Sequence, residues 1–306
     1  MKTELWEFIS ENTSLPAKLW LPEGEPAAVL QITHGMTEHI GRYESFAEQM
    51  TAHGVAVFGF DLRGHGKNGG DEEIASFGQG GWELSLKDMR NFYDEMKTRM
   101  KNAPYFMMGF SLGSFLLREY LSRYPDGIDG AIIMGTGYQP GWILSVMKAI
   151  VVGERKKAGF DGTTPLVKKL SFETYNTKFS PNETDSDWLC ADGDELYAYI
   201  RDPLCRKYIS AELFLQLLES MQRTGKRNAA SGWKKDMPVL LISGEDDSVG
   251  NGGKGVRKIG EQLEKLGMTD VAVRLFPNAR HDLLHEKASG NADEAVSALL
   301  TWMGTR

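Results

Sequence analysis

The chain has 306 residues, and it is poor in cysteine and in excess positive charge. Two cysteines, Cys190 and Cys205, are too few for an extracellular disulfide framework. We therefore expect two reduced thiols, with a single disulfide as the alternative. The 42 acidic residues outnumber the 35 basic ones, which argues against a nucleic-acid partner, because such proteins need a basic surface.

Long apolar runs are also missing. No stretch approaches the roughly 20 apolar residues that a membrane-spanning helix needs. The first ten residues, MKTELWEFIS, lack the apolar centre and the cleavage site of a signal peptide. These two shortages lead us to expect a cytoplasmic protein.

What the chain does have is a regular alternation of apolar strands and amphipathic helices. Residues 5–10 and 16–22 alternate between apolar and polar side chains, which is typical of half-buried antiparallel strands. Six further runs are almost continuously apolar, as in parallel strands buried on both faces: 27–33, 55–61, 105–110, 131–136, 239–244 and 271–276. With helical patterns between them, they predict an α/β fold with a mostly parallel eight-stranded sheet and helices on both faces.

About a hundred residues interrupt this alternation, between the strand ending near Gly135 and the strand starting near Pro238. They contain four helical patterns joined by polar loops, and a structureless loop of this length is improbable in a compact domain. We expect residues 138–235 to form a helical cap inserted into a core of residues 1–137 and 236–306. The cap would lie over the carboxyl edge of the sheet, where ligands bind in such folds.

A serine between two glycines follows one of the apolar runs. Gly109-Phe110-Ser111-Leu112-Gly113 fits the G-x-S-x-G nucleophile elbow, in which a sharp turn from strand to helix exposes the serine hydroxyl. The alternative is a small residue in an ordinary tight turn. The strand before Ser111 and the helical pattern after it favour the elbow.

A serine nucleophile needs a base, and the base needs an acid that orients it. In this architecture the acid and then the histidine follow the serine along the chain. Only His281 and His285 come after Ser111, and His281 is favoured because it directly follows the last predicted strand. The acid should follow the preceding strand, and the residues there leave Glu245, Asp246 and Asp247 as candidates.

The reaction also needs N–H donors for an oxyanion. The backbone N–H of Leu112, at the start of a helix, and that of Met36, in the loop THGMTEHIGRY, are the candidates; a simple turn is the alternative for the second. We find no spacing typical of metal ligands and expect neither a metal nor an organic cofactor.

Five blocks in order, HGMTEHIGRY, DLRGHG, GFSLGS, SGEDDSV and NARHDLLHE, resemble the monoacylglycerol lipase and lysophospholipase-like branch of the α/β-hydrolase superfamily, also described as serine aminopeptidase-type hydrolases. The resemblance implies an α/β-hydrolase fold with Ser111 as nucleophile, Asp247 as acid and His281 as base. It also implies Met36 and Leu112 as oxyanion donors. Phe110 and Leu112 stand where this branch often has His and Met.

The resemblance implies a serine hydrolase of carboxylic esters, such as monoacylglycerols, lysophospholipids or related acyl esters. Two alternatives stay open: an iminopeptidase or amidase using the same triad, and a non-catalytic binding module. One helical face of the cap carries six apolar residues. They either pack against the protein or form a lid that lines an acyl tunnel or touches lipid. These residues are Trp142, Ile143, Val146, Met147, Ile150 and Val151.

Two residues of the DLRGHG block are expected to order a loop. We interpret Arg63 and His65 in this way and expect no direct catalytic role for either. The sequence leaves the oligomeric state open.

Overall fold

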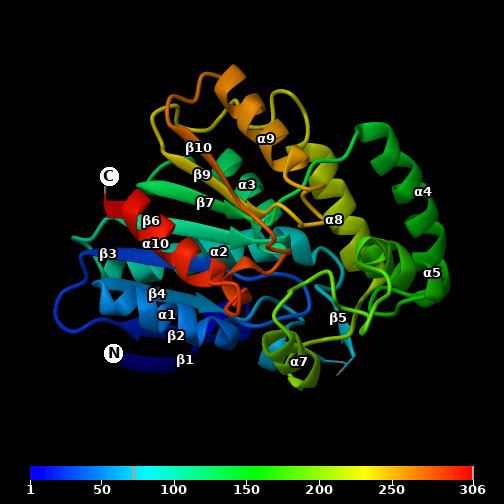
Figure 1. The fold of residues 1–306 in the computed structure, drawn as a ribbon, viewed down its shortest axis with the longest axis horizontal. Helices are drawn as coiled ribbons and strands as arrows, with labels where there is room; N and C mark the ends of the chain where they lie inside the picture. The colour runs from blue at the N-terminus through cyan, green and yellow to red at the C-terminus, as the bar shows by residue number, and fades with distance from the viewer. Residues whose placement is uncertain (71–72, 305–306) are drawn as a thin grey trace.

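The computed structural model describes residues 1–70 and 73–304, and an eight-stranded sheet forms the centre of the fold (Figure 1). The strand order is β1-β2-β4-β3-β6-β7-β9-β10. The first three strands in this order pair antiparallel, and the others pair parallel. The bounds are β1 Lys2–Ser10, β2 Thr13–Leu21, β3 Ala28–Thr33, β4 Val55–Phe60, β6 Tyr105–Phe110, β7 Gly130–Met134, β9 Val239–Gly244 and β10 Val271–Phe276.

Helices cover both faces of the sheet and enclose two apolar cores (Figure 1). One core lies under α1 and α10, and the other under α2, α3 and α9. The bounds are α1 Glu44–Ala52, α2 Gly81–Arg99, α3 Leu112–Arg123, α9 Lys254–Lys265 and α10 Asn291–Gly304. The predicted α/β-hydrolase fold, with its mostly parallel eight-stranded sheet, is confirmed.

One strand differs from the prediction. The run 271–276 was expected to be buried on both faces, but in β10 only Phe276 is buried and Arg274 is exposed. The prediction was wrong because β10 is an edge strand, which among the described strands pairs with β9 alone. Each of the other five apolar runs forms a strand that is buried along its length.

Helices dominate the segment between β7 and β9, as expected, and α4 and α5 lie at the right-hand side of Figure 1. A two-residue strand, β8, is an addition that the sequence did not predict; it pairs with β5 near the start of α2. The bounds are α4 Gly141–Ala158, α5 Pro165–Lys168, α6 Thr174–Asn176, α7 Gly193–Arg201, α8 Ala211–Thr224, β5 Ile74–Ala75 and β8 Tyr208–Ile209. The division into core and cap at residues 138 and 235 stays a prediction.

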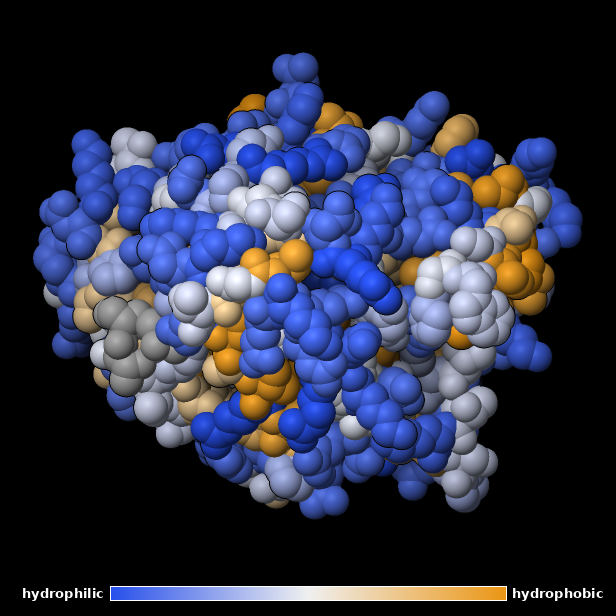
Figure 2. All heavy atoms as spheres, turned by 90° about the horizontal axis from the view of Figure 1, so that it is seen from above, coloured by the Kyte–Doolittle hydropathy of each residue, from blue (hydrophilic) through white to orange (hydrophobic). Residues whose placement is uncertain are grey.

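The predicted apolar face of α4 is divided between burial and exposure. Val151 is fully buried, whereas Trp142, Val146 and Ile150 are 72%, 55% and 39% exposed. Figure 2 shows a mostly hydrophilic face with apolar residues in a band near its centre and again at its right-hand end, the end at which α4 lies in Figure 1. Within the described residues, no helix is both long enough and apolar enough to cross a bilayer.

Candidate active site

Ser111 occupies the turn between β6 and α3. Its backbone has φ 49° and ψ −114°, a conformation that is unfavourable for a residue with a side chain. Three hydrogen bonds hold the turn: the Ser111 N–H donates to the Met134 carbonyl (2.9 Å), and both the N–H and the hydroxyl of Ser114 donate to the Ser111 carbonyl (2.9 and 2.6 Å). The surrounding structure therefore fixes a conformation that the chain would otherwise avoid.

Both flanking glycines are required by close approach of the backbone. A Cβ atom at Gly109 would lie 2.3 Å from the Gly113 carbonyl oxygen, and one at Gly113 would lie 2.0 Å from the Thr33 carbonyl oxygen. These distances are too short for any side chain. The spacing G-x-S-x-G therefore lets α3 start directly against the ends of β6 and β3.

The side chains of Ser111, His281 and Asp247 form a continuous hydrogen-bonded chain. His281 Nε2 lies 2.8 Å from Ser111 Oγ, and its Nδ1 lies 2.9 Å from Asp247 Oδ1. The three residues are 7%, 1% and 0% exposed, respectively. Parallel strands deliver them to one edge of the sheet: Ser111 follows β6, Asp247 follows β9 and His281 follows β10. With the carboxylate on Nδ1, Nε2 can accept a proton from the serine.

The Asp247 carboxylate is buried and stays ionised because its partners outweigh the cost of burial. Burial alone would raise the pKa of Asp247, but the His281 ring, the Ser243 hydroxyl and the Val249 N–H hold this pKa below its ordinary value. The Ser243 hydroxyl donates to Oδ2 at 2.7 Å, and the Val249 N–H donates to Oδ1 at 2.8 Å. The carboxylate therefore has a fixed orientation toward the ring.

Two aromatic rings enclose the His281 imidazole. The ring centroids of Phe110 and Trp188 each lie 5.0 Å from that of His281. Phe110 precedes the serine, whereas Trp188 comes from the segment between β7 and β9. Sequence reasoning did not find Trp188, because it stands in no recognisable motif.

The structure separates the alternatives that the sequence left open. Asp246 faces Lys178, with Oδ1 at 2.9 Å from the ammonium nitrogen. His285 lies 2.8 Å from Asp282 and has no contact with Ser111. The Glu245 side chain forms no hydrogen bond with His281 or with Lys178. Only Asp247 and His281 come together with Ser111.

The two predicted oxyanion donors come from the elbow itself and from the loop that packs on it. Leu112 is the first residue of α3, and Met36 is in the loop after β3. This loop packs tightly on the elbow, since a Cβ atom at Gly35 would lie 3.0 Å from the Phe110 ring. In the described part of the chain, neither N–H donates to a protein acceptor. Their role as oxyanion donors stays a prediction.

A network of buried charges orders the loop that carries Met36. Glu38 accepts hydrogen bonds from the Gly35 N–H and the Arg42 guanidinium, both at 2.5 Å, and Arg42 also donates to Asp282 at 2.8 Å. Burial alone would raise the pKa of Asp282, but His285 and Arg42 hold it well below its usual range. Sequence reasoning missed this network, although the charged residues stand inside the blocks HGMTEHIGRY and NARHDLLHE.

Arg63 and His65 order the neighbouring loop, as expected. Arg63 donates two hydrogen bonds to the fully buried Asp88 carboxylate, at 2.6 and 2.8 Å. His65 donates from Nδ1 to the Arg63 carbonyl at 2.8 Å. Burial lowers the pKa of His34 and that of His65 to about 3, so both buried rings are neutral near pH 7.

The sequence profile of the serine aminopeptidase S33 hydrolases matches residues 24–288, which include Ser111, Asp247 and His281. The chain belongs to this family. Among its relatives, a monoacylglycerol lipase of Mycolicibacterium smegmatis is 23% identical over 282 residues, covering 88% of this chain and 86% of the relative. A monoglyceride lipase of Homo sapiens is 25% identical over 301 residues, covering 97% of this chain and 89% of the relative.

Solved structures show the same fold. A carboxyl esterase from Bacillus coagulans, in complex with glycerol, superposes with a TM-score of 0.89 at 22% identity and covers 100% of this chain and 99% of its own. A monoacylglycerol lipase of Paleococcus ferrophilus has a TM-score of 0.68 at 23% identity, covering 95% and 98%. At these identities the likeness concerns the fold alone.

In this member of the S33 family, one side-chain cluster has the residue types of a metal site. Ligand atoms of His39, Asp202 and Cys205 lie within 4.8 Å of one another. However, His39 Nδ1 accepts the Gly41 N–H at 3.1 Å, so the ring proton is on Nε2, which donates to Asp202 at 2.8 Å. Because both ring nitrogens are already used, the cluster suits a hydrogen bond better than a metal ion.

Both cysteines are free and buried, in line with the expectation of reduced thiols. Burial raises the pKa of Cys190 and that of Cys205 far above the ordinary range of a thiol. Neither thiol is therefore activated as a nucleophile.

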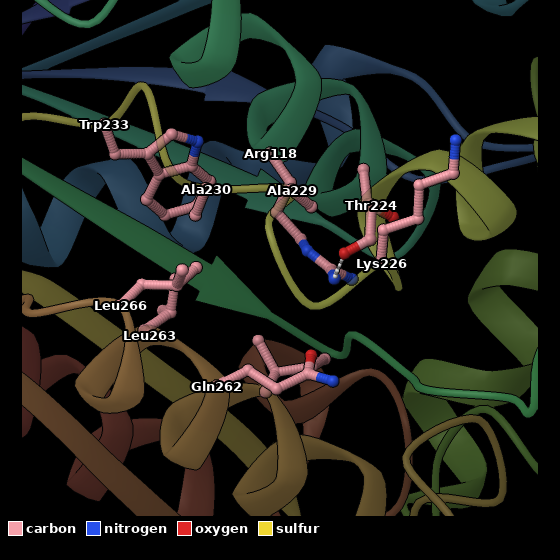
Figure 3. Close-up of a pocket in the computed structure, with 10 residues that line it drawn as sticks. Arg118, Thr224, Lys226, Ala229, Ala230, Trp233, Gln262, Leu263 and Leu266 are labelled. Carbon is pink, nitrogen blue, oxygen red and sulfur yellow. Dashed lines mark hydrogen bonds between the residues drawn. The ribbon is translucent and has the colours of Figure 1, made fainter.

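Two cavities of this S33 hydrolase differ in their relation to Ser111. A small one of about 20 Å³ lies between α3, α9 and residues 224–233, with Arg118 on its wall about two helical turns beyond Ser111 (Figure 3). It contains none of the predicted site residues. A larger one of about 440 Å³ is lined by Trp188, Tyr199, Arg206 and other residues between β7 and β9. Since Trp188 also packs on His281, the larger cavity adjoins the candidate active site.

Proposed function

We propose that this protein hydrolyses acyl esters through an acyl-enzyme on Ser111. The observation that carries the proposal is the buried hydrogen-bonded chain from Asp247 through His281 to Ser111, with distances of 2.9 and 2.8 Å. The strained backbone of Ser111 supports it, because such strain at a serine between β6 and α3 is characteristic of a nucleophile elbow.

The proposed mechanism has two steps. The Ser111 oxygen attacks the ester carbonyl while His281 Nε2 accepts the hydroxyl proton, and Asp247 stabilises the charged imidazole. The proton then passes to the leaving alcohol, and water, activated by His281 in the same way, cleaves the acyl-enzyme. The N–H groups of Met36 and Leu112 would stabilise the oxyanion, each by about 3 kcal/mol. Every step uses groups of the protein and water.

The chain is a carboxylic ester hydrolase, and its substrate is inferred from its relatives. Monoacylglycerol lipases of a bacterium and of humans align over most of the chain, and the Bacillus coagulans esterase holds glycerol. We propose a monoacylglycerol, a lysophospholipid or a related acyl ester as the substrate. The cavity of about 440 Å³ next to Trp188 has the size of a small-molecule site.

We also propose that residues 138–235 act as a cap that controls access to Ser111. The exposed residues Trp142, Val146 and Ile150 on α4 would make transient contact with a membrane surface that contains the substrate.

A second candidate is hydrolysis of an amide or a peptide N-terminus by the same three residues. The observation that favours it is a set of exposed carboxylates, Glu173, Glu183 and Asp185, on the wall of the larger cavity. Carboxylates there could attract a substrate amine. A non-catalytic binding module is the remaining alternative, and the complete triad disfavours it.

The test of this function is the Ser111→Ala variant. We expect it to lose 4-nitrophenyl ester hydrolysis by a factor on the order of 10⁴ or more, and to resist labelling by a fluorophosphonate probe. The exposed Ser297→Ala variant on α10 is the matched control and should keep both properties. Labelling of the Ser111→Ala protein at the wild-type rate would refute the assignment.

A further inference from the structure

The inner wall of the larger cavity contains a buried positive charge that the proposed mechanism does not use. Arg206 is only 6% exposed. Its Nη groups donate to the carbonyls of Pro203 (3.0 Å) and Gly66 (2.8 Å), and its Nε is enclosed by the protein without a partner within residues 1–70 and 73–304. None of the carboxylates in these residues lies within 4 Å of the guanidinium. Burying a charge without a counter-ion is costly, so this arrangement favours an anionic ligand.

A second unpaired cation lines the same cavity. Lys168, at the end of α5, is half-buried, and its ammonium lies 3.4 Å from the centroid of the Tyr208 ring. It too forms no ion pair with the described carboxylates. Lys207, by contrast, is exposed and pairs with Glu73 at 2.8 Å. The unpaired positive charges are thus the ones nearer the interior.

Arg206 is tied to the candidate active site through one loop. Its backbone N–H donates to the Thr37 carbonyl at 2.8 Å, and Thr37 follows the predicted oxyanion donor Met36. The Thr37 hydroxyl also lies 2.7 Å from that of Tyr199, which lines the cavity. The cavity and the candidate active site therefore share this loop, and Trp188 lines the cavity while its ring packs on His281.

The acidic residues of the cavity lie at its exposed rim. Glu173, Glu183 and Asp185 are all exposed, so water and salt screen their charges. A guanidinium in the less polar interior acts on a ligand with less screening. Its planar set of N–H donors also matches the oxygens of a carboxylate or a phosphate.

We propose that this cavity is an anion subsite, in which Arg206 and Lys168 bind a carboxylate or phosphate group on the substrate ester. The inference rests on the proposed function and narrows its substrate class. The preferred ester then has a negatively charged group at a distance from the scissile carbonyl.

The first experiment compares three esters that differ only in the end of the acyl chain. They are the 4-nitrophenyl esters of hexanoate, of adipate with its second carboxylate free, and of 6-(trimethylammonio)hexanoate. A second pair places the charge on the alcohol: the butyrate esters of 4-hydroxybenzoate and of its methyl ester. kcat/KM is measured for each with the wild type and with the variants Arg206→Met, Lys168→Met and Lys207→Met.

The quantity compared is the ratio of kcat/KM for the anionic ester to kcat/KM for the neutral ester of the same set. We expect Arg206→Met to lower this ratio by about tenfold or more in at least one set. Lys168→Met should lower the same ratio by a smaller factor. Lys207→Met removes one positive charge that is already paired, and it should leave the ratio unchanged. If Arg206→Met fails to fold, Lys168→Met and Arg206→Lys decide the question, the latter with partial loss.

Equal effects of the three variants on all esters would overturn the subsite, as would a wild-type preference for the trimethylammonio ester. A wild type inactive on every ester would instead refute the proposed function. Calorimetry then tests the subsite independently of turnover, by comparing the affinities of octyl phosphate and octanol for the Ser111→Ala variant. Equal affinity for the two ligands would overturn it.

Discussion

Individual residues of the site have orientations that are fixed by contacts outside the triad. Asp247 could turn away from His281 were it not for the Ser243 hydroxyl and the Val249 N–H, which hold its two oxygens. The ring of His281 is in turn held between Phe110 and Trp188. Together these contacts select the imidazole tautomer that has a free lone pair toward Ser111.

Replacing the Asp247 carboxylate by an amide should disturb that tautomer. We expect Asp247→Asn to fold normally and to lower kcat for a soluble ester by a factor on the order of 10⁴. Asp246→Asn, which removes a neighbouring carboxylate that pairs with Lys178, should lower kcat less than about twofold. Steady-state kinetics on the two variants makes the comparison, and similar losses in both would contradict the role of Asp247.

At this scale the sequence predicted the residues that stand in local patterns. Ser111 is recognisable because the elbow needs glycine at fixed positions, and His281 follows the last strand directly. Trp188 and Arg206 were not predicted. Their positions next to His281 and Thr37 depend on how the segment between β7 and β9 packs, and no local spacing encodes this.

At the scale of single elements, the loops that follow β3 and β4 each contain a buried, neutral histidine. His34 accepts the Leu62 N–H at 2.9 Å, and His65 has no partner for Nε2 among the described residues. Burial lowers the pKa of each to about 3. An unfolded histidine binds a proton below about pH 6.5, whereas these two do so only near pH 3 in the folded protein. The stability that they contribute is therefore lost as the pH falls below about 6.5.

His65→Asn tests this linkage, because the amide can still donate to the Arg63 carbonyl but cannot titrate. Between pH 7 and pH 5 we expect the unfolding free energy of the wild type to fall by about 2 kcal/mol more than that of the variant. Urea unfolding at the two pH values measures the difference. His53→Asn, at an exposed histidine, is the control and should behave as the wild type. Parallel pH dependence in wild type and His65→Asn would contradict the assignment.

Helix α4 presents apolar side chains to solvent, and its proposed contact with lipid can be tested on one of them. Trp142→Ser should weaken binding to phosphatidylcholine vesicles by about tenfold in a flotation assay, because the largest exposed apolar side chain is removed. kcat/KM for a soluble short-chain ester should stay within about twofold. Leu5→Ser, at a 69% exposed residue of β1, should leave vesicle binding unchanged. Loss of vesicle binding in both variants would refute a specific role of α4.

The molecule as a whole contains an apolar core that continues from the sheet into the segment between β7 and β9. Leu218 on α8 and Leu117 on α3 belong to the same buried cluster. The sequence predicted the sheet and its helices, since their periodicity is local. It did not predict this continuity, because which helix packs on α3 is decided by long-range contacts.

A shared core predicts cooperative unfolding. We expect calorimetry to show one transition, with equal calorimetric and van't Hoff enthalpies. Leu218→Ala should destabilise the whole protein by about 3 kcal/mol without splitting this transition. Two separate transitions in either protein would show that the proposed cap unfolds by itself.

The first strand in the sheet order, β1, pairs with β2 and with no other strand of the described residues. It leaves the backbone groups of one side without a neighbouring strand, and its outward residues Leu5 and Ile9 are 69% and 66% exposed. Glu7 stands between them on the same face, Lys2 and Glu4 lie on the other face, and charge along an open strand discourages pairing with a second molecule. Neutralising these charges would let the open edge of β1 pair with a strand of a second molecule. The resistance of the protein to aggregation therefore depends on a strand that is remote from the candidate active site.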